Sequence, residues 1–165
     1  MSIKALYLNT SLKTGEDTSN TEALMQKSMD ILENESVETE LIRIADYNII
    51  PGMSADMGGG DEWPEIFRKI NDSDIIVIGT PIWNGHKSSL ATTVMERIYA
   101  QSSETAENGQ SKYYNKVFGT VVTGNEDGAK KQVVQFSLVR QTPVLRPRPI
   151  QMHTGAVKPG PVHLI

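Results

Sequence analysis

Hydroxyl, amide and ammonium groups gather in one stretch of the chain, at Thr10, Ser11, Lys13, Ser19, Asn20 and Thr21. The stretch leads into a segment whose apolar residues have helical spacing. The free N–H groups and positive dipole end of a helix amino terminus favour an anion, and Lys13 adds a full charge, so the sequence predicts phosphate binding. An alternative is a capping box at Ser19-x-x-Glu22, which leaves Thr10 and Ser11 unexplained. The Gly-Lys-Ser/Thr signature of a P-loop is absent.

A tryptophan stands on a turn directly after the most apolar strand-like run. Residues 74–80 are apolar on both faces, and the turn Thr80-Pro81-Ile82-Trp83-Asn84-Gly85 follows. A large aromatic side chain there is well placed to lie against a flat ring. The alternative is a surface aromatic that packs on its own loop, with Ser88 or Ser89 capping the next helix. His86 has no histidine or carboxylate partner nearby in sequence, so we interpret it as a loop residue.

Two glycines bracket a third polar turn, Thr123-Gly124-Asn125-Glu126-Asp127-Gly128, after the apolar run 116–122. Glycine allows the backbone to approach a ligand closely. Asparagine and aspartate also suit an ordinary turn, so this segment alone is weak support for a binding site. Whether this turn belongs to a binding site therefore depends on where it lies in the fold.

Four strand–helix alternations would bring the three segments together. Strands are expected at 3–9, 37–44, 74–80 and 116–122, and helices at about 20–34, 61–71, 88–100 and from 129. This alternation predicts an α/β fold with a parallel sheet, right-handed crossovers and helices on both faces. Ligands of such sheets bind outside the carboxyl ends of the strands, where the strand order switches. The three segments follow the first, third and fourth strands, so we expect them to meet there.

Apolar periodicity also predicts which residues face the core. The expected inward residues are Ala23, Leu24, Ser28, Ile31 and Leu32 in the first helix, Trp63, Ile66, Phe67 and Ile70 in the second, and Leu90, Ala91, Val94, Met95 and Ile98 in the third. Residues 101–115 are polar and contain glycine, which predicts a surface excursion.

Composition excludes several classes of protein. Residues 1–127 hold all 20 acidic and 10 of the 16 basic residues, a net charge of −10 that argues against a nucleic-acid partner. No apolar run approaches the ~20 residues that cross a bilayer, and residues 1–10 lack a signal-peptide design. We therefore expect a cytoplasmic protein with no membrane partner. Because the chain has no cysteine, it has no disulfide, thiol nucleophile or cysteinyl metal site, and no metal site is predicted.

The end of the chain differs in composition, and we predict a domain at 1–139 followed by an atypical basic tail at 140–165. Residues 128–165 carry a net charge of +6 without one carboxylate. Pro143, Pro147 and Pro149 remove three backbone donors where a fifth core strand would be expected, so the fifth strand and helix are expected to be incomplete. Two interpretations stay open, a frameshift near 136–141 or a genuine proline-rich arm that packs on a partner.

The chain resembles the flavodoxin-like NAD(P)H-dependent FMN reductases over roughly residues 3–135. The resembling motifs are Gly60-Asp61-Glu62-Trp63-Pro64, Gly79-Thr80-Pro81-Ile82-Trp83-Asn84-Gly85 with Ser88-Ser89, and Thr123-Gly124-Asn125-Glu126-Asp127-Gly128-Ala129. The first loop departs from the family's Gly-Ser-x-Arg and reads Asn9-Thr10-Ser11-Leu12-Lys13, and Lys130-Lys131 replaces two histidines. Codons that are allowed for the tail, when read in a shifted reading frame, can encode amino-acid sequences similar to the carboxyl terminus of the family.

The resemblance implies a flavodoxin-like doubly wound sheet of strand order 2-1-3-4-5 in three layers, α/β/α. It implies FMN as cofactor, NAD(P)H as transient electron donor, a quinone, flavin or similar acceptor, and a homodimer. The phosphate would be held by Ser11, Lys13, Ser19, Asn20 and Thr21, with Thr10 beside them. The flavin ring would lie between Pro81, Ile82, Trp83, Asn84 and Gly85 on one side and Thr123, Gly124, Asn125, Asp127 and Gly128 on the other. Because the redox chemistry belongs to the cofactor, we predict no catalytic acid, base or nucleophile.

Two other functions remain open from the sequence. An electron carrier of the flavodoxin type would bind FMN without oxidising nicotinamide, and the acidic charge of residues 1–127 suits one. A flavin-free module would result if the altered tail abolished binding. The loops at 9–13 and 80–85 resemble the reductases more than the carriers.

Overall fold

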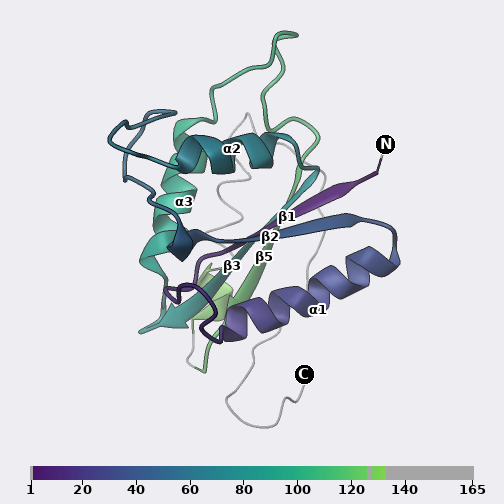
Figure 1. Ribbon diagram of the computed structural model, residues 1–165, viewed down its shortest axis with the longest axis vertical. Coiled ribbons are helices and arrows are strands. Elements are labelled where there is room, and N and C mark those ends of the chain that lie inside the picture. Colours follow the sequence, from purple (N-terminus) through teal and green to yellow (C-terminus); the bar gives the residue numbers. More distant parts are fainter. Residues whose placement is uncertain (1, 126–127, 133–165) are drawn as a thin grey trace.

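Parallel strands form the centre of the computed structural model, which describes residues 2–125 and 128–132 (Figure 1). The strands are β1 (Lys4–Asn9), β2 (Glu38–Arg43), β3 (Ile75–Trp83) and β5 (Val117–Thr123). They lie in the order β2-β1-β3-β5, so the predicted 2-1-3-4 arrangement of the first four expected strands is confirmed. A strand of two residues, β4 (His86–Lys87), pairs antiparallel with the end of β3 and was not predicted.

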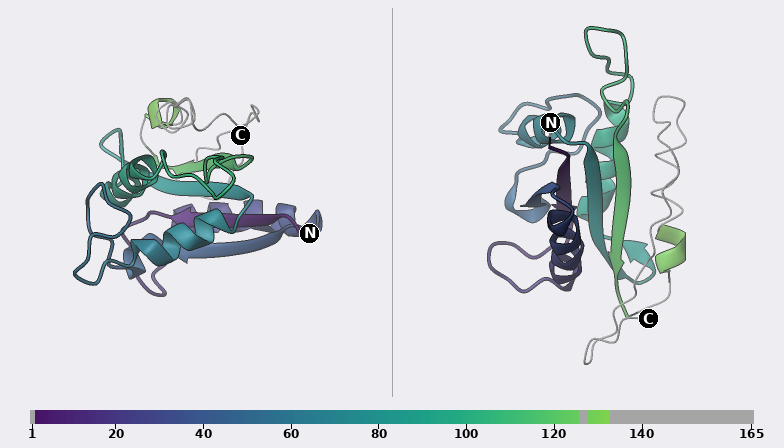
Figure 2. Two further views of the ribbon diagram at one scale, coloured as in Figure 1. Left: turned by 90° about the horizontal axis from the view of Figure 1, so that it is seen from above. Right: turned by 90° about the vertical axis from the view of Figure 1, so that its right-hand side faces the viewer.

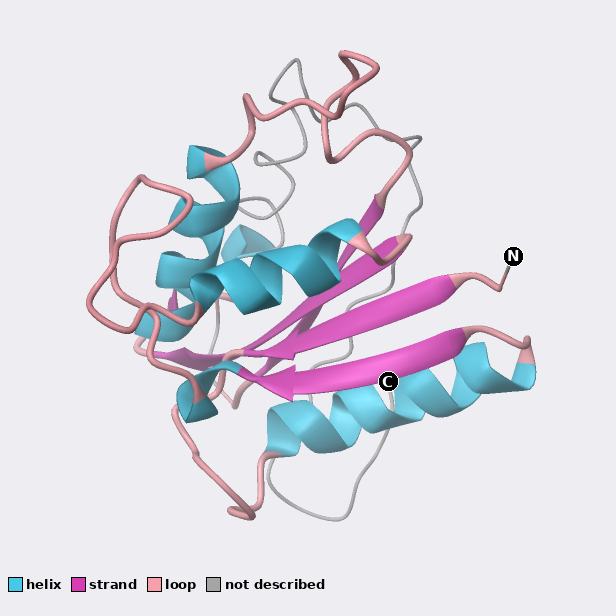
Figure 3. Cartoon of the chain, turned by 45° about the horizontal axis from the view of Figure 1, so that its top comes forward, coloured by secondary structure: helices cyan, strands magenta, loops and turns pink. Residues whose placement is uncertain are grey.

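Helices cover both faces of this sheet (Figures 2 and 3). One face is covered by α1 (Asn20–Asn34), and the other by α2 (Trp63–Asn71) and α3 (Ser89–Ala100). A short 3-10 turn, η1 (Ile44–Asp46), follows β2. Because successive strand residues point to opposite faces, β1 and β3 supply both cores. The α1 side buries Ala5, Tyr7, Met25, Met29 and Val77, and the α2–α3 side buries a larger cluster that includes Leu6, Leu8, Ile66, Ile76, Ile78 and Val94.

The buried stripe of α1 differs from the predicted one. Met25 and Met29 are buried, whereas Ile31 is 65% exposed and Ala23 is also exposed. Gly79 in β3 supplies the reason, because a Cβ at Gly79 would lie 2.3 Å from Sδ of Met25. The missing side chain lets α1 approach the central strand along its methionine face, and apolar spacing within α1 does not reveal this partner.

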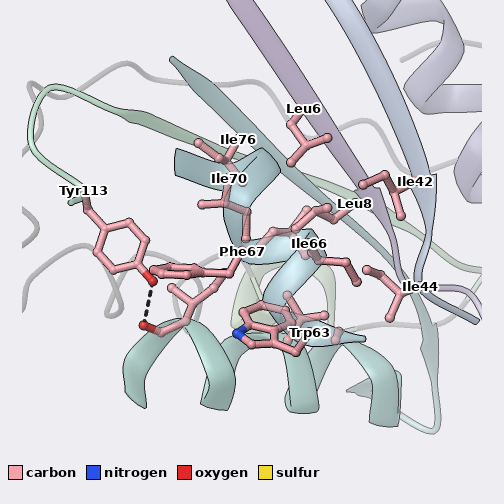
Figure 4. Packing of buried hydrophobic residues seen from close by; sticks show 14 residues of the cluster. Leu6, Leu8, Ile42, Ile44, Trp63, Ile66, Phe67, Ile70, Ile76 and Tyr113 are labelled. Atoms are coloured by element: carbon pink, nitrogen blue, oxygen red, sulfur yellow. Dashed lines mark hydrogen bonds between the residues drawn. The ribbon is translucent and has the colours of Figure 1, made fainter. Parts of the chain in front are cut away.

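Aromatic side chains fill the core beneath α2 and α3 (Figure 4). The ring centroids of Trp63 and Phe67 lie 6.5 Å apart, and Phe67 meets the ring of Tyr113 edge to face at 6.1 Å. The hydroxyl of Tyr113 donates to the carbonyl of Ile98 at 2.9 Å. All four predicted inward residues of α2 are buried. Most of residues 101–115 are exposed, as expected of a surface excursion, but Tyr113 is only 2% exposed and belongs to the core.

A buried ion pair ties the segment before α2 to α3. Asp61 and Arg97 have fully buried side chains, with Oδ2 of Asp61 2.7 Å from Nη2 of Arg97. Arg97 also donates to the carbonyls of Ile50 and Ala55 at 2.8 and 3.2 Å. Burial opposes ionisation of Asp61, but three backbone N–H groups and Arg97 outweigh it and lower the pKa of Asp61 below its usual value of 3.8. The pair thus holds residues 50–61 against α3.

Predictions for the end of the chain fall largely outside the described residues. Residues 129–132 are helical, in agreement with the helix expected from 129. The boundary at 139, the incomplete fifth strand and helix, and the tail at 140–165 lie within 133–165, which the structure does not describe. Of the helices in the described ranges, none combines the length and apolar character that a membrane span requires.

Candidate functional site

The three predicted segments meet at the carboxyl ends of β1, β3 and β5. The hydroxyl and N–H of Thr10 both donate to the carbonyl of Gly79, at 2.6 and 2.8 Å, which ties the first segment to β3. Ser88 is the N-cap of α3, the helix that follows the second segment, and its hydroxyl donates to the carbonyl of Thr10 at 2.7 Å. The hydroxyl oxygens of Thr21 and Thr123 lie 2.7 Å apart and connect the first segment to the third. The convergence expected from the topology is therefore present.

The first segment folds around the amino end of α1. Ser19 is the N-cap, and its Oγ accepts from the N–H of Glu22 at 3.2 Å and donates to Oγ of Ser11 at 3.1 Å. Ser11 and Ser19 are both buried. The capping interpretation of Ser19 is confirmed for its hydroxyl, but it does not account for Ser11. The first N–H groups of α1 lack intrahelical acceptors, so this end of the helix has the donors and the positive dipole that an anion requires.

The carboxylate of Glu22 is neutralised by side chains from the sheet. Oε2 of Glu22 accepts from Nδ2 of Asn9 at 2.9 Å and from Nε of Arg43 at 2.6 Å. The hydrogen bond to Glu22 raises the pKa of Arg43 above its usual value. An uncompensated carboxylate in the first turn of α1 would repel an anion bound at the helix end. Arg43, at the end of β2, offsets that repulsion and was not predicted as a site residue.

Lys13 and Asn20 lie at the rim of the first segment. Both are exposed, and the ammonium group of Lys13 donates to the carbonyl of Thr18 within the same loop. Thr10, Ser11 and Thr21 are instead buried among the contacts that join the segments. The predicted phosphate residues thus divide into a buried set of hydroxyls and an exposed set that carries the positive charge.

Trp83 lies at the tip of a β-hairpin. β3 continues to Trp83, beyond the predicted strand end at residue 80, and Trp83 pairs with His86. The two turn residues, Asn84 and Gly85, have φ angles of 51° and 74°, which match a type I′ turn. Asn-Gly between two extended residues is the local signal that would have predicted this hairpin. Because Trp83 is 48% exposed, its indole is not part of the hydrophobic core.

The third segment packs on the hairpin through its glycines. A Cβ on Gly124 would lie 3.1 Å from Cβ of Ile82, the residue of β3 directly before Trp83. Gly128 has a φ of 125°, and a Cβ there would lie 3.1 Å from both Cα and O of Gly85. At both positions a side chain would make a contact tighter than is usual for a Cβ atom, so the third segment packs closely on the hairpin. The close neighbours in the structure are groups of the protein, and the predicted approach of these glycines to a ligand stays a prediction.

The remaining predicted residues of the second and third segments are less tightly connected. Pro81 is the register partner of Thr123 in the β3–β5 pairing, so these two residues lie side by side. Asn125 is exposed at the end of the turn. Asp127 lies outside the described residues, and its predicted role stays a prediction.

Three buried polar residues that sequence reasoning left unassigned complete the site. Oδ1 of Asn9 accepts from the N–H of Ser11 at 3.0 Å and shapes the first loop. Ser88, expected only as a helix cap, also bonds to the first segment. Nε2 of Gln132 donates to the carbonyl of Gly85 at 2.9 Å. The position of Asn9 at the last residue of a strand was an available signal, whereas the partner of Gln132 is 47 residues away and leaves no local pattern.

This arrangement suits a flat ligand with an anionic arm. Hydroxyls and free N–H groups lie at the amino end of α1, while an exposed indole and glycine-rich backbone lie at the neighbouring strand ends. Across residues 2–125 and 128–132, no group of three or more histidine, aspartate or glutamate side chains is placed to hold a metal ion. His86 is exposed at the hairpin.

Comparison with known proteins agrees with this geometry. The sequence model of a family described as "NADPH-dependent FMN reductase" matches residues 3–146. The crystal structure of RosB with bound 8-demethyl-8-formylriboflavin-5′-phosphate superimposes with a TM-score of 0.74 and 30% identity, over 94% of this chain and 64% of that chain. The flavodoxin-like α/β fold expected from the sequence is thereby confirmed.

Two curated relatives are similar over most of this chain. The 8-demethyl-8-aminoriboflavin-5′-phosphate synthase of Streptomyces davaonensis is 36% identical over 138 residues, which cover 78% of this chain and 54% of that protein. The divalent metal cation transporter MntH of Mycobacterium bovis is 36% identical over 168 residues, which cover 98% of this chain and 25% of the transporter. The chain thus spans about half of the first relative and about a quarter of the second.

Proposed function

Because the chain belongs to the NADPH-dependent FMN reductase family, we propose that it binds FMN across the three segments and passes electrons from NAD(P)H to a quinone, a flavin or a similar small acceptor. The observation that carries this proposal is the meeting of an anion-binding helix end, an exposed indole and a glycine turn at the carboxyl ends of three parallel strands. The contacts Thr21–Thr123 and Gly85–Gly128 join these parts directly.

The described residues fit an FMN molecule. The hydroxyls of Ser11, Ser19 and Thr21, with the rim residues Lys13 and Asn20, would hold its phosphate. The isoalloxazine would lie between the hairpin of Trp83 and the turn that begins at Gly124. A nucleotide phosphate at a helix amino terminus needs no basic cluster, because the N–H groups and the dipole supply the attraction.

FMN, when bound, supplies the hydride-accepting and electron-transferring chemistry. The protein's residues then bind, orient and shield it. The indole of Trp83 would contact the face of the ring, and backbone groups with Asn125 would hydrogen-bond its pyrimidine edge. No side chain is proposed as acid, base or nucleophile, because the redox chemistry would belong to the cofactor.

Titration of the purified protein with FMN, followed by its visible spectrum and flavin fluorescence, tests the proposal. Saturable quenching with one FMN per chain, and oxidation of NADPH or NADH only in its presence, are the expected results. FMN binding without nicotinamide oxidation would instead identify a flavodoxin-type electron carrier. A colourless protein that leaves FMN fluorescence unchanged would contradict both.

A second candidate function is favoured by the similarity to the Streptomyces synthase, whose name describes a modified riboflavin 5′-phosphate as its product. The same three segments would then hold a flavin phosphate as substrate. Mass spectrometry of the flavin after incubation with NAD(P)H and acceptor separates the two functions. A reductase returns FMN of unchanged mass, whereas a flavin-modifying enzyme converts it.

We also propose that the protein is a cytoplasmic homodimer. Its lack of cysteine suits a reducing compartment, and a second subunit could cover the exposed indole. Sedimentation analysis with and without FMN tests the dimer.

The frameshift interpretation of residues 136–141 stays a prediction, and sequencing the source gene across these codons decides it. The match to the family model extends to residue 146.

A further inference from the structure

Gln132 is buried where the third segment meets the hairpin. Its side chain is 0% exposed, and its Nε2 donates to the carbonyl of Gly85 at 2.9 Å. Its backbone N–H bonds to the carbonyl of Gly128 at 3.1 Å, which places the side chain on the first turn after the glycine. Gly85 is therefore contacted by two parts of the third segment, the backbone of Gly128 and the amide of Gln132.

Burial of the Gln132 amide is energetically unfavourable unless its polar atoms form hydrogen bonds. Oε1 of Gln132 is buried and has no hydrogen-bond partner within the described residues. An apolar side chain of similar size would fill the same volume without leaving a buried polar atom unsatisfied. The bond from Nε2 to Gly85 is thus the contribution that leucine or methionine could not supply.

The acceptor of this bond lies in the turn that carries Trp83. The hairpin of β3 and β4 has two register pairs between its strands, Ile82–Lys87 and Trp83–His86. A two-stranded hairpin is marginally stable by itself in water, so its direction depends on what packs against it. The contacts from Gly128 and Gln132 are made at the turn, close to the indole and far from the strand's pairing with β1.

We propose that Gln132 is a positioning residue that fixes the Trp83 hairpin against the third segment and so sets the place of the indole beside the flavin. This inference rests on the proposed FMN function for its effect on binding, but not for its effect on the hairpin. The amide acts through Gly85, and it is not required to touch the ligand.

The substitution Gln132→Met tests the proposal, because methionine keeps the length and volume of the side chain and removes the donor. The matched control is Gln101→Met. Gln101 is also buried, and its Oε1 accepts from the indole N–H of Trp63 at 2.7 Å, in the core beneath α2 and α3. Gln101 follows the last turn of α3, about 20 Å along the helix axis from Ser88. Both variants lose one buried side-chain hydrogen bond.

Two measurements on each protein decide the outcome. Hydrogen exchange of the peptide spanning residues 82–88 is expected to accelerate about tenfold in the ligand-free Gln132→Met protein and to stay unchanged in Gln101→Met. The dissociation constant for FMN is expected to rise about tenfold in the first variant alone, while both variants melt at lower temperature. Unchanged exchange and affinity in Gln132→Met would overturn the proposal, and so would equal effects in the two variants. If the wild-type protein failed to bind FMN, the proposed function would fail, and the exchange experiment would still decide whether Gln132 anchors the hairpin.

Discussion

Thr21, in the first turn of α1, and Thr123, at the last residue of β5, share a hydrogen bond of 2.7 Å between hydroxyls that are 102 residues apart. Both side chains are buried, at 2% and 4% exposure. The bond connects the first and third segments without any ligand. The two segments are therefore joined by groups of the protein itself.

A double-mutant cycle measures this bond. Thr21→Val or Thr123→Val alone leaves the partner hydroxyl buried and unpaired, so each is expected to lower the free energy of unfolding by about 1–3 kcal/mol. The double valine variant removes both polar groups and should lose less than the sum of the two single changes. Urea denaturation provides the values, and strictly additive losses would show that the two hydroxyls are not coupled.

Trp83→Ala is expected to weaken FMN binding about tenfold while leaving the melting temperature of the ligand-free protein nearly unchanged. The indole is 48% exposed and belongs to neither core cluster of residues 2–125 and 128–132, so its removal costs little folding free energy. The control is Tyr114→Ala, which removes an aromatic side chain that is 65% exposed in the excursion between α3 and β5. Fluorescence titration with FMN distinguishes them, and equal affinities in both variants would remove Trp83 from the site.

Lys13→Met should weaken binding of FMN about threefold and leave binding of riboflavin, which lacks the phosphate, unchanged. The ammonium group is exposed, so its attraction to a phosphate is screened and the difference should shrink at high salt. Lys27→Met, which removes an exposed lysine about two turns into α1, serves as the control. Loss of riboflavin affinity in Lys13→Met would contradict a phosphate-specific role.

Gly128→Ala combines strain with a steric conflict, because φ is 125° and the new Cβ would lie 3.1 Å from the backbone of Gly85. We expect faster hydrogen exchange at the hairpin and a large loss of FMN affinity. Gly109→Ala is the matched control, with a φ of 77° and no atom within 4 Å of the new Cβ. It should cost about 1 kcal/mol of stability through backbone strain alone and leave FMN binding intact.

Asp61→Asn breaks the buried pair with Arg97 and is expected to lower the free energy of unfolding at neutral pH by about 3–5 kcal/mol. The pKa of Asp61 is lowered in the folded protein, so the carboxylate stabilises the fold above the usual pKa of 3.8 and loses that contribution as the pH falls through the lowered value. The gap in stability between wild type and variant should therefore narrow in acid. Denaturation curves from neutral pH to about pH 2 test this, and a gap that stays constant would contradict the assignment.

The sequence alone was sufficient to predict those helices and strands whose buried residues form one strong apolar pattern. β3 is apolar on both faces because it is central, and α2 shows all four of its buried residues at helical spacing. These patterns predicted a parallel sheet whose strand ends share an edge, while the strand order came from the family resemblance. The positions of Thr10, Ser11 and Trp83 at that edge followed from topology alone.

Features that depend on distant partners were not predictable in this way. Met25 faces the sheet because Gly79, on another strand, has no side chain, and Tyr113 is buried because its hydroxyl reaches the carbonyl of Ile98. Arg97 is in the core because Asp61 compensates its charge, and neither residue alone indicates burial. The type I′ hairpin is different, since its Asn-Gly signal lies in the sequence and was overlooked.

The contacts that unite the site extend from Thr10 to Gln132, across nearly the whole described chain. A molecule held by all three segments would bridge β1 and β5. Unfolding of the protein would then require the ligand to dissociate, so ligand binding would stabilise the whole fold. Each tenfold excess of such a ligand over its dissociation constant would then add about 1.4 kcal/mol to global stability. Melting temperature would consequently report occupancy even in a colourless assay.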